Sequence, residues 1–198
     1  MADGRVEHPA NTRQTTTERI GPRRYRPGRL LPLAQNAKKA LFLQPMQLKP
    51  GDSLPRFSRP DHTGREVSDA DLAGSQAVIY FYPRAFTPGC TTESCDFRDN
   101  YRAFQEAGYE VYGVSPDPVD RLEDFRREHD LAFPLLSDTD HAMAEAFGAW
   151  GVKTNYGKEY EGIIRSTFTV DADGRIGHAW YNVRAAGHVQ RVSSEVLQ

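Results

Sequence analysis

The chain has 198 residues, of which 38% are hydrophobic, and this is enough for one globular domain with a sizeable core. No apolar run approaches the roughly 18 residues of a membrane-spanning helix, so we expect no membrane span. The net charge is −2, but residues 1–45 hold nine Lys and Arg against three Asp and Glu, and the remainder holds sixteen against twenty-four. An acidic domain argues against nucleic acid as its partner.

The two cysteines, Cys90 and Cys95, are too few for a disulfide scaffold in a chain of this length. They fit a working thiol pair in a reducing compartment better, and we therefore expect a cytoplasmic protein. Two thiols without a second Cys or His pair fall short of the four ligands of a zinc site. The six histidines show no metal-ligand spacing. We therefore expect no metal and no cofactor.

Residues 1–45 differ in composition from residues 46–198, since they are basic, rich in Pro and Arg, and show little periodicity. This pattern favours a disordered extension. A targeting segment and an upstream start, with the natural chain beginning at Met46, remain open alternatives. We expect the folded domain to span residues 46–198.

The first elements of this domain follow from turn signals and apolar runs. Residues 49–74 contain three turn signals and leave room for two short strands and one helical turn. The apolar run Ala77–Tyr82 predicts a buried strand. Thr87 suits a helix N-cap and Pro88 the first helical position, and Gly108 should end that helix.

The remaining elements continue this alternation of strands and helices. We expect a strand at Tyr109–Ser115, followed after Pro118 by a helix that buries Val119, Leu122 and Phe125. A strand at Leu131–Leu136 and a helix at Thr139–Phe147 should come next. The chain should end with a hairpin of Thr167–Val170 and Ile176–Tyr181 and a helix at Gly187–Leu197. The order implies an α/β domain with a mixed central sheet and helices on both faces.

The stretch Tyr80–Tyr101, YFYPRAFTPGCTTESCDFRDNY, carries the chemistry. Cys90 falls in the first turn of the predicted helix, where free N–H groups and the helix dipole favour an anion. That position favours the thiolate, which is the nucleophilic form of cysteine. A buried structural cysteine is the plainer alternative.

The pattern Pro83-x-x-x-Thr87-x-x-Cys90 resembles the active-site signature of the peroxiredoxins. The longer motif FYP…TPGCT…C…FRD is similar to that of one branch of the peroxiredoxins, the bacterioferritin-comigratory or Q type. The resemblance runs from about Leu48 to the C-terminus and includes GVSPD at 113–117, FPLLSD at 133–138 and IRSTF at 164–168. It implies a thioredoxin-like fold, with the active cysteine at the head of the helix that follows a central strand.

The resemblance also implies a role for five residues. Cys90 would be the peroxidatic cysteine, whose thiolate attacks a peroxide oxygen and becomes a sulfenic acid. Cys95 would be the resolving cysteine that condenses with it. Thr87 would bond the thiolate and the peroxide, and Pro83 would shield the thiolate from water. Arg165 would approach from another strand and favour the thiolate by its charge.

The implied activity is a thioredoxin-dependent thiol peroxidase of the atypical two-cysteine kind, which reduces hydrogen peroxide and organic hydroperoxides. We expect a monomer whose partners are the hydroperoxide and a thioredoxin-like reductant. A disulfide oxidoreductase is disfavoured because its C-x-x-C spacing is absent, whereas a redox sensor or a holdase stays open. Glu93 is explained by the helix dipole alone, Trp150 by packing, and His188 by the start of the last helix.

Overall fold

The structure is a computed structural model of the whole chain, and it describes Met1, residues 46–155 and residues 157–197. The predicted extension therefore lies outside the described residues, apart from Met1. The elements are β1 (Ser58–Pro60), β2 (Glu66–Ser68), the 3₁₀ turn η1 (Asp69–Leu72), β3 (Gln76–Phe81), α2 (Pro88–Glu106), β4 (Tyr109–Ser115), α3 (Val119–Glu128), β5 (Leu135–Ser137), α4 (Ala142–Ala146), β6 (Trp150–Asn155), β7 (Lys158–Ile163), β8 (Ser166–Val170), β9 (Ile176–Trp180) and α5 (His188–Val196).

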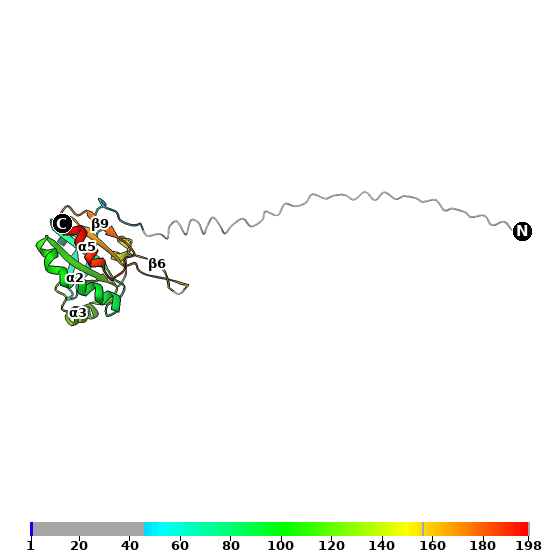
Figure 1. Cartoon of the computed structure of the whole chain (residues 1–198), viewed down its shortest axis with the longest axis horizontal. Coiled ribbons are helices and arrows are strands. Elements are labelled where there is room, and N and C mark those ends of the chain that lie inside the picture. Colours follow the sequence, from blue (N-terminus) through cyan, green and yellow to red (C-terminus); the bar gives the residue numbers. More distant parts are fainter. Residues whose placement is uncertain (2–45, 156, 198) are drawn as a thin grey trace.

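A mixed five-stranded sheet with the order β5-β4-β3-β8-β9 forms the centre of the domain (Figure 1). β3 is parallel to β4 and antiparallel to β8, so it is the central strand. Its residues Ala77–Phe81 are buried, as expected for a continuous apolar run with cover on both faces. The predicted mixed sheet is confirmed, and so is the hairpin of β8 and β9.

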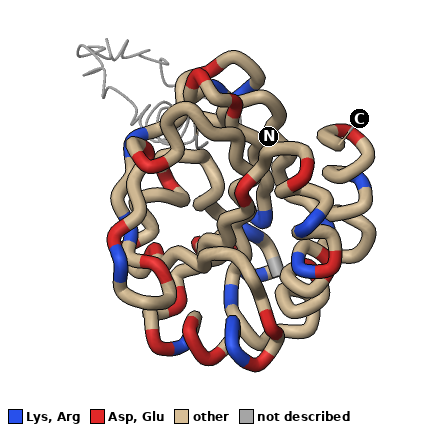
Figure 2. Tube along the Cα trace, turned by 90° about the vertical axis from the view of Figure 1, so that its left-hand side faces the viewer, with Lys and Arg blue, Asp and Glu red and all other residues tan. Residues whose placement is uncertain are grey.

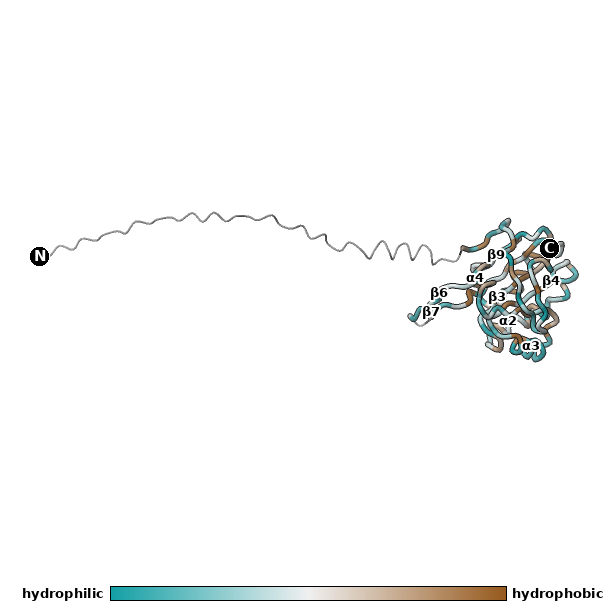
Figure 3. Tube along the Cα trace, turned by 180° about the vertical axis from the view of Figure 1, so that it is seen from behind, coloured by the Kyte–Doolittle hydropathy of each residue, from teal (hydrophilic) through white to brown (hydrophobic). Residues whose placement is uncertain are grey.

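Alternate residues of β3 divide the interior into two hydrophobic clusters. Val78 and Tyr80 face α2, α3 and α5, whereas Ile79 and Phe81 face α4 and η1. The predicted helices on both faces of the sheet are therefore confirmed. Hydrophobic segments lie inside the domain, with hydrophilic ones around them (Figure 3). In the view of Figure 2, acidic and basic residues are interspersed along the loops and helices.

Two predicted elements are shorter than expected. The strand predicted at Leu131–Leu136 is β5, Leu135–Ser137, because the Leu131 N–H still donates to the Arg126 carbonyl at the end of α3 and Pro134 has no N–H to donate. The helix predicted at Thr139–Phe147 is α4, Ala142–Ala146. It starts late because the buried Asp138 carboxylate accepts the N–H groups of Met143 and Ala144, at 3.0 and 2.8 Å.

The hairpin of β6 and β7 was not predicted. Its two strands pair from Trp150 with Ile163 out to Asn155 with Lys158, and it projects from the body of the domain (Figures 1 and 3). Most of β7 is exposed, so the sequence lacks the alternation of apolar and polar residues that a half-buried strand shows. At its base the hairpin leads directly to the segment that carries Arg165.

Candidate active site

The site is built around Cys90 at the start of α2. Thr87 is the N-cap residue, Pro88 is the first helical residue, and Cys90 follows in the first turn, as predicted. Cys90 is fully buried. One turn further on, the hydroxyls of Ser94 and Tyr80 lie 2.9 Å apart and tie α2 to the central strand. The thiol therefore sits on a helix start that is fixed against the sheet, where a negative charge is favoured.

Arg165 approaches Cys90 from the segment between β7 and β8. Its Nη2 lies 3.1 Å from Cys90 Sγ, and its side chain is 14% exposed. The Arg165 carbonyl accepts the N–H of Val183 at 3.0 Å, which fixes the backbone on this side of the site. A guanidinium at this distance stabilises a thiolate by charge and by a hydrogen bond.

Glu93 completes the buried charge network. It lies three residues after Cys90, on the same face of α2, and its Oε2 pairs with Arg165 Nη1. Burial raises the pKa of Glu93 to about 7, against the attraction of Arg165. Burial lowers the pKa of Arg165, but Glu93 and Cys90 together hold it above its ordinary value. The guanidinium is therefore charged and is held between the carboxyl group and the sulfur.

The helix dipole alone does not explain why an acidic residue stands at position 93. A first-turn acid that only interacts with the dipole would stay solvated, whereas Glu93 is fully buried and forms an ion pair with Arg165. The sequence signal was its spacing of three residues from Cys90, which places both side chains on one helix face. Oε1 of Glu93 is buried and has no hydrogen-bond partner among the described residues.

Thr87 and Pro83 lie in the loop before α2, three and seven residues before Cys90 in the sequence. The Thr87 hydroxyl donates to the Arg84 carbonyl at 2.9 Å and makes no capping hydrogen bond to the helix. The position of Thr87 as N-cap was thus predicted correctly, whereas a side-chain cap was not formed. The Tyr82 N–H makes a last hydrogen bond to Val114 of the sheet, and Pro83 ends the strand because it has no N–H.

Cys95 lies on the same continuous helix as Cys90, and both thiols are free. Five helical residues give a rise of about 7.5 Å and a rotation of about 140°, so the two Cα atoms are about 8.6 Å apart. This exceeds the limit of about 7 Å for a disulfide. Burial raises the pKa of the half-buried Cys95 thiol. The structure therefore shows a reduced pair that cannot bond without a change in α2.

Lys153, on β6, is a second cation near the thiol that sequence reasoning missed. Its Nζ donates to the Ile163 carbonyl at 2.8 Å. Burial lowers the pKa of Lys153 and Arg165 lowers it further, whereas Cys90 attracts its charge. No sequence signal could have found this residue, because the hairpin that positions it was not predicted.

The other residues considered from the sequence lie in packed positions. Trp150 stacks on His141 with ring centroids 3.8 Å apart, in agreement with a packing role. His188 is the first residue of α5, and its Nε2 lies 2.8 Å from Thr167 Oγ1. No helix in the described part of the chain is long and apolar enough to span a membrane. The same residues contain no cluster of three His, Cys, Asp or Glu side chains that could hold a metal.

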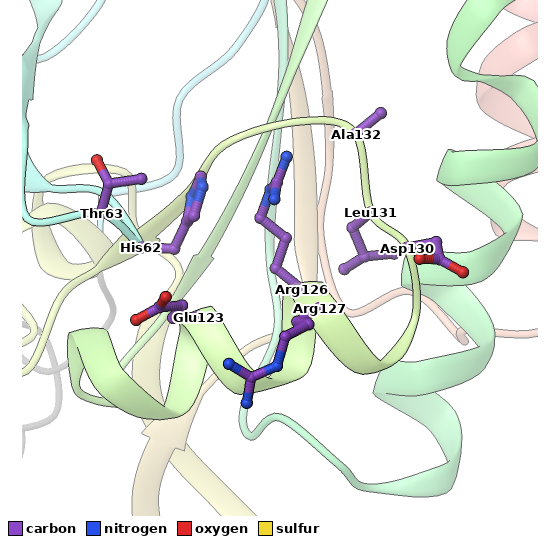
Figure 4. Close-up of a pocket in the computed structure, with 8 residues that line it drawn as sticks. All are labelled: His62, Thr63, Glu123, Arg126, Arg127, Asp130, Leu131 and Ala132. Atoms are coloured by element: carbon purple, nitrogen blue, oxygen red, sulfur yellow. The ribbon is translucent and has the colours of Figure 1, made fainter.

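A pocket of about 470 Å³ lies on another part of the surface, between the β1–β2 turn and the end of α3 (Figure 4). It is lined by His62, Thr63, Glu123, Arg126, Arg127, Asp130, Leu131 and Ala132. These residues carry both signs of charge and include none of the groups around Cys90. This pocket is therefore separate from the thiol site.

Comparison with known proteins agrees with this site. Residues 50–179 match the model of the AhpC/TSA family. A relative in Mycobacterium tuberculosis is 51% identical over 150 residues, which cover 76% of this chain and 96% of that protein. Peroxiredoxin Bcp of Escherichia coli is 45% identical over 141 residues, which cover 71% and 90% of the two chains. The solved bacterioferritin comigratory protein of Xanthomonas campestris superposes with a TM-score of 0.69 at 37% identity and covers 73% of this chain and 97% of its own.

The chain belongs to the AhpC/TSA family. Within that family it is a peroxiredoxin of the bacterioferritin-comigratory, or Q, type. The thioredoxin-like fold that the sequence implied is confirmed by the mixed sheet and by its structural relatives.

Proposed function

We propose that this peroxiredoxin reduces hydrogen peroxide and organic hydroperoxides at Cys90, with Cys95 as the resolving cysteine and a thioredoxin-like protein as reductant. The observation that carries the proposal is the contact of 3.1 Å between Arg165 Nη2 and the buried Cys90 Sγ in the first turn of α2. The Xanthomonas relative supports the choice of substrate, since it is a protein with alkyl peroxide reduction activity.

In the first step the Cys90 thiolate attacks the terminal oxygen of the hydroperoxide. An S–O bond forms and the O–O bond breaks, so sulfur loses two electrons and the peroxide gains them. The leaving oxygen takes a proton and departs as water or an alcohol. Arg165 stabilises the thiolate before the attack and the negative charge that develops on the leaving oxygen during it. Glu93 holds the guanidinium in place.

In the second step the Cys95 thiol attacks the sulfenic acid of Cys90. The S–S bond forms, and the sulfenic oxygen leaves as water with the proton of Cys95. Because the two cysteines are about 8.6 Å apart on a continuous helix, the first turns of α2 must unwind before this step. The reaction is that of an atypical two-cysteine peroxiredoxin, in which one chain provides both thiols.

In the third step a dithiol reductant restores the enzyme. One of its thiolates attacks the Cys90–Cys95 disulfide, and its second thiol releases the reduced peroxiredoxin with a disulfide left on the reductant. Since one chain completes the cycle, we infer that a monomer is active. The cycle needs a compartment that keeps thiols reduced, and we infer the cytoplasm.

The test is NADPH consumption in the presence of thioredoxin, thioredoxin reductase and a hydroperoxide. The proposal predicts repeated turnover by the wild type and none by Cys90→Ser. Cys95→Ser should complete a single turnover or turn over slowly. Reduction of insulin disulfides without peroxide turnover would identify a disulfide oxidoreductase instead. Oxidation of Cys90 without repeated turnover would identify a redox sensor.

A further inference from the structure

The loop between β3 and α2, residues 82–87, holds an unfavourable backbone conformation directly before the helix that carries Cys90. Phe86 has φ +65°, in the left-handed region that bulky side chains rarely adopt. Such a conformation persists only where the surrounding structure enforces it. The contacts that enforce it come from the turn after β4 and from the first turn of α3.

Asp117 lies in that turn and is 8% exposed. Its Oδ2 accepts the N–H of Ala85 at 2.6 Å and the hydroxyl of Ser115 at 2.7 Å. The Asp117 carbonyl accepts the hydroxyl of Ser137 at 2.7 Å, which fixes the turn to β5. A buried carboxylate on a rigid turn therefore holds the loop by a charge-assisted hydrogen bond.

Arg121 lies one helical turn after Asp117 and holds the same loop from a second direction. Its Nη2 donates to the Ala85 carbonyl at 3.1 Å, and its Nε lies 3.1 Å from Asp117 Oδ1 as an ion pair without hydrogen-bond geometry. The guanidinium carbon lies 5.0 Å from the centroid of the Phe86 ring. Phe125 also packs against this ring, with centroids 5.1 Å apart.

We propose that Asp117 and Arg121 form a clamp on Ala85 and Phe86 that keeps the start of α2 folded and Cys90 beside Arg165. Both backbone polar groups of Ala85 are held by this pair, and Phe86 is held under the guanidinium. The clamp does not touch the reacting atoms, so Asp117 and Arg121 are positioning residues. The effect of the clamp on the reaction rates rests on the proposed function. Its effect on the opening of the loop rests on the contacts alone.

The clamp controls two steps in opposite directions. Peroxide attack needs the folded helix start, in which Arg165 contacts Cys90. Disulfide formation needs the opened one. A weaker clamp therefore slows the oxidation of Cys90 but hastens the arrival of Cys95 at the sulfenic acid. A faster arrival leaves less sulfenic acid for a second peroxide molecule, so less sulfinic acid forms. A general loss of stability would not slow one step and hasten the other.

The variants that test the clamp are Arg121→Met, Asp117→Asn and Arg121→Lys. Arg121→Met removes the ion pair and the bond to Ala85, whereas Arg121→Lys keeps the charge with fewer donors and should give intermediate values. The matched control is Arg127→Met, which removes an exposed ion pair with Asp124 on the same helix.

The first measurement is amide hydrogen exchange of residues 85–92 in the reduced protein, which needs no peroxidase activity. In Arg121→Met and Asp117→Asn the amides of residues 85–92 should exchange about tenfold faster than in the wild type, because the loop opens more often. The amides of the central sheet should exchange at the wild-type rate. Arg127→Met should match the wild type. Exchange within twofold of the wild type in a folded Arg121→Met variant would overturn the clamp, whatever the enzyme does.

The second measurement follows the reaction with hydrogen peroxide by stopped flow and by intact mass. Because the loop opens about tenfold more often, Arg121→Met should form a sulfinic fraction up to about tenfold smaller in excess peroxide, and it should oxidise Cys90 more slowly than the wild type. Equal sulfinic fractions in Arg121→Met and the wild type would overturn the proposed control of the two steps. Absence of Cys90 oxidation in the wild type would overturn the proposed function instead, and the exchange result would still decide whether the clamp exists.

Discussion

Arg165 contacts Cys90 across 75 residues of sequence, with 3.1 Å between Nη2 and Sγ. The two residues come from the segment before β8 and from the first turn of α2. Only the complete fold brings them together. The reactivity of the thiol therefore depends on the packing of the whole domain, and disturbing Arg165 should affect Cys90 directly.

Replacing Arg165 by Ala should slow the alkylation of Cys90 at pH 7 by about tenfold, because the thiolate loses a cation in direct contact. The rate of peroxide attack at pH 7 should fall by at least the same factor. The measurement is the alkylation rate at pH 7 in a Cys95→Ser background. Arg184→Ala, at an exposed arginine, is the control and should leave the rate unchanged. An unchanged rate in Arg165→Ala would show that the contact does not govern the thiolate.

Oxidation should unwind the start of α2, because the continuous helix keeps Cys90 and Cys95 too far apart to bond. Amide protection of residues 89–100 should drop by at least about tenfold in the disulfide form, since the hydrogen bonds of these turns are lost. Protection of the sheet serves as the internal control. If a disulfide verified by mass leaves residues 89–100 equally protected, no unwinding is needed.

His188 should make stability depend on pH. Burial, followed by the charges of Arg191 and Arg165, lowers the pKa of His188 from 6.5 to about 4. The unfolded state therefore binds the proton first as the pH falls. The stabilising contribution is fully present above pH 6.5 and is lost as the pH falls towards 4, at up to about 1.4 kcal/mol per pH unit.

The measurement is urea unfolding of the wild type and of His188→Gln between pH 4 and 6.5. Glutamine can keep a hydrogen bond to Thr167 but does not titrate, so the difference between the two proteins should shrink as the pH falls. This difference also removes the contribution of Glu93, whose raised pKa acts in the opposite direction as the pH falls from 7 to 4.5. A constant difference over this range would mean that His188 keeps its unfolded-state pKa.

Removal of residues 1–45 should leave peroxidase activity unchanged and the Tm within about 2 °C. The described domain is anchored at its start by the Leu48 N–H, which donates to the Tyr181 hydroxyl at 2.7 Å. Tyr181 in turn donates to the Phe147 carbonyl at 2.7 Å. The comparison is between the full chain and residues 46–198. A loss of several degrees or of most activity would show that the first segment contributes to the fold or the site.

Local sequence predicts the start of α2 well, because Thr87, Pro88 and the apolar run before them act through neighbouring residues. The same holds for β4 and for the hairpin of β8 and β9, where period and turn residues agree. The contact of Arg165 with Cys90 is different. Nothing in the residues around Arg165 indicates its partner, so this expectation came from the family resemblance alone.

The features that sequence reasoning missed depend on contacts between distant segments or on exposed strands. Glu93 is buried in an ion pair with Arg165, and its spacing from Cys90 on α2 does not by itself reveal that partner. The β6–β7 hairpin is stabilised by pairing of exposed strands, and Lys153 is positioned by it. The hydrogen bond from the Ala85 N–H to the Asp117 carboxylate joins residues that are 32 apart in the sequence. A family motif such as GVSPD marks Asp117 but does not show what it binds.

The most direct test of the central claim, that Cys90 is the thiol that reduces peroxide, is the intact mass of Cys95→Ser after one equivalent of hydrogen peroxide. Without a resolving cysteine the sulfenic acid should persist long enough to be trapped by dimedone. The account predicts one dimedone adduct per chain, located at Cys90 by peptide mapping, and none in Cys90→Ser. Consumption of peroxide while Cys90 remains a free thiol would contradict it.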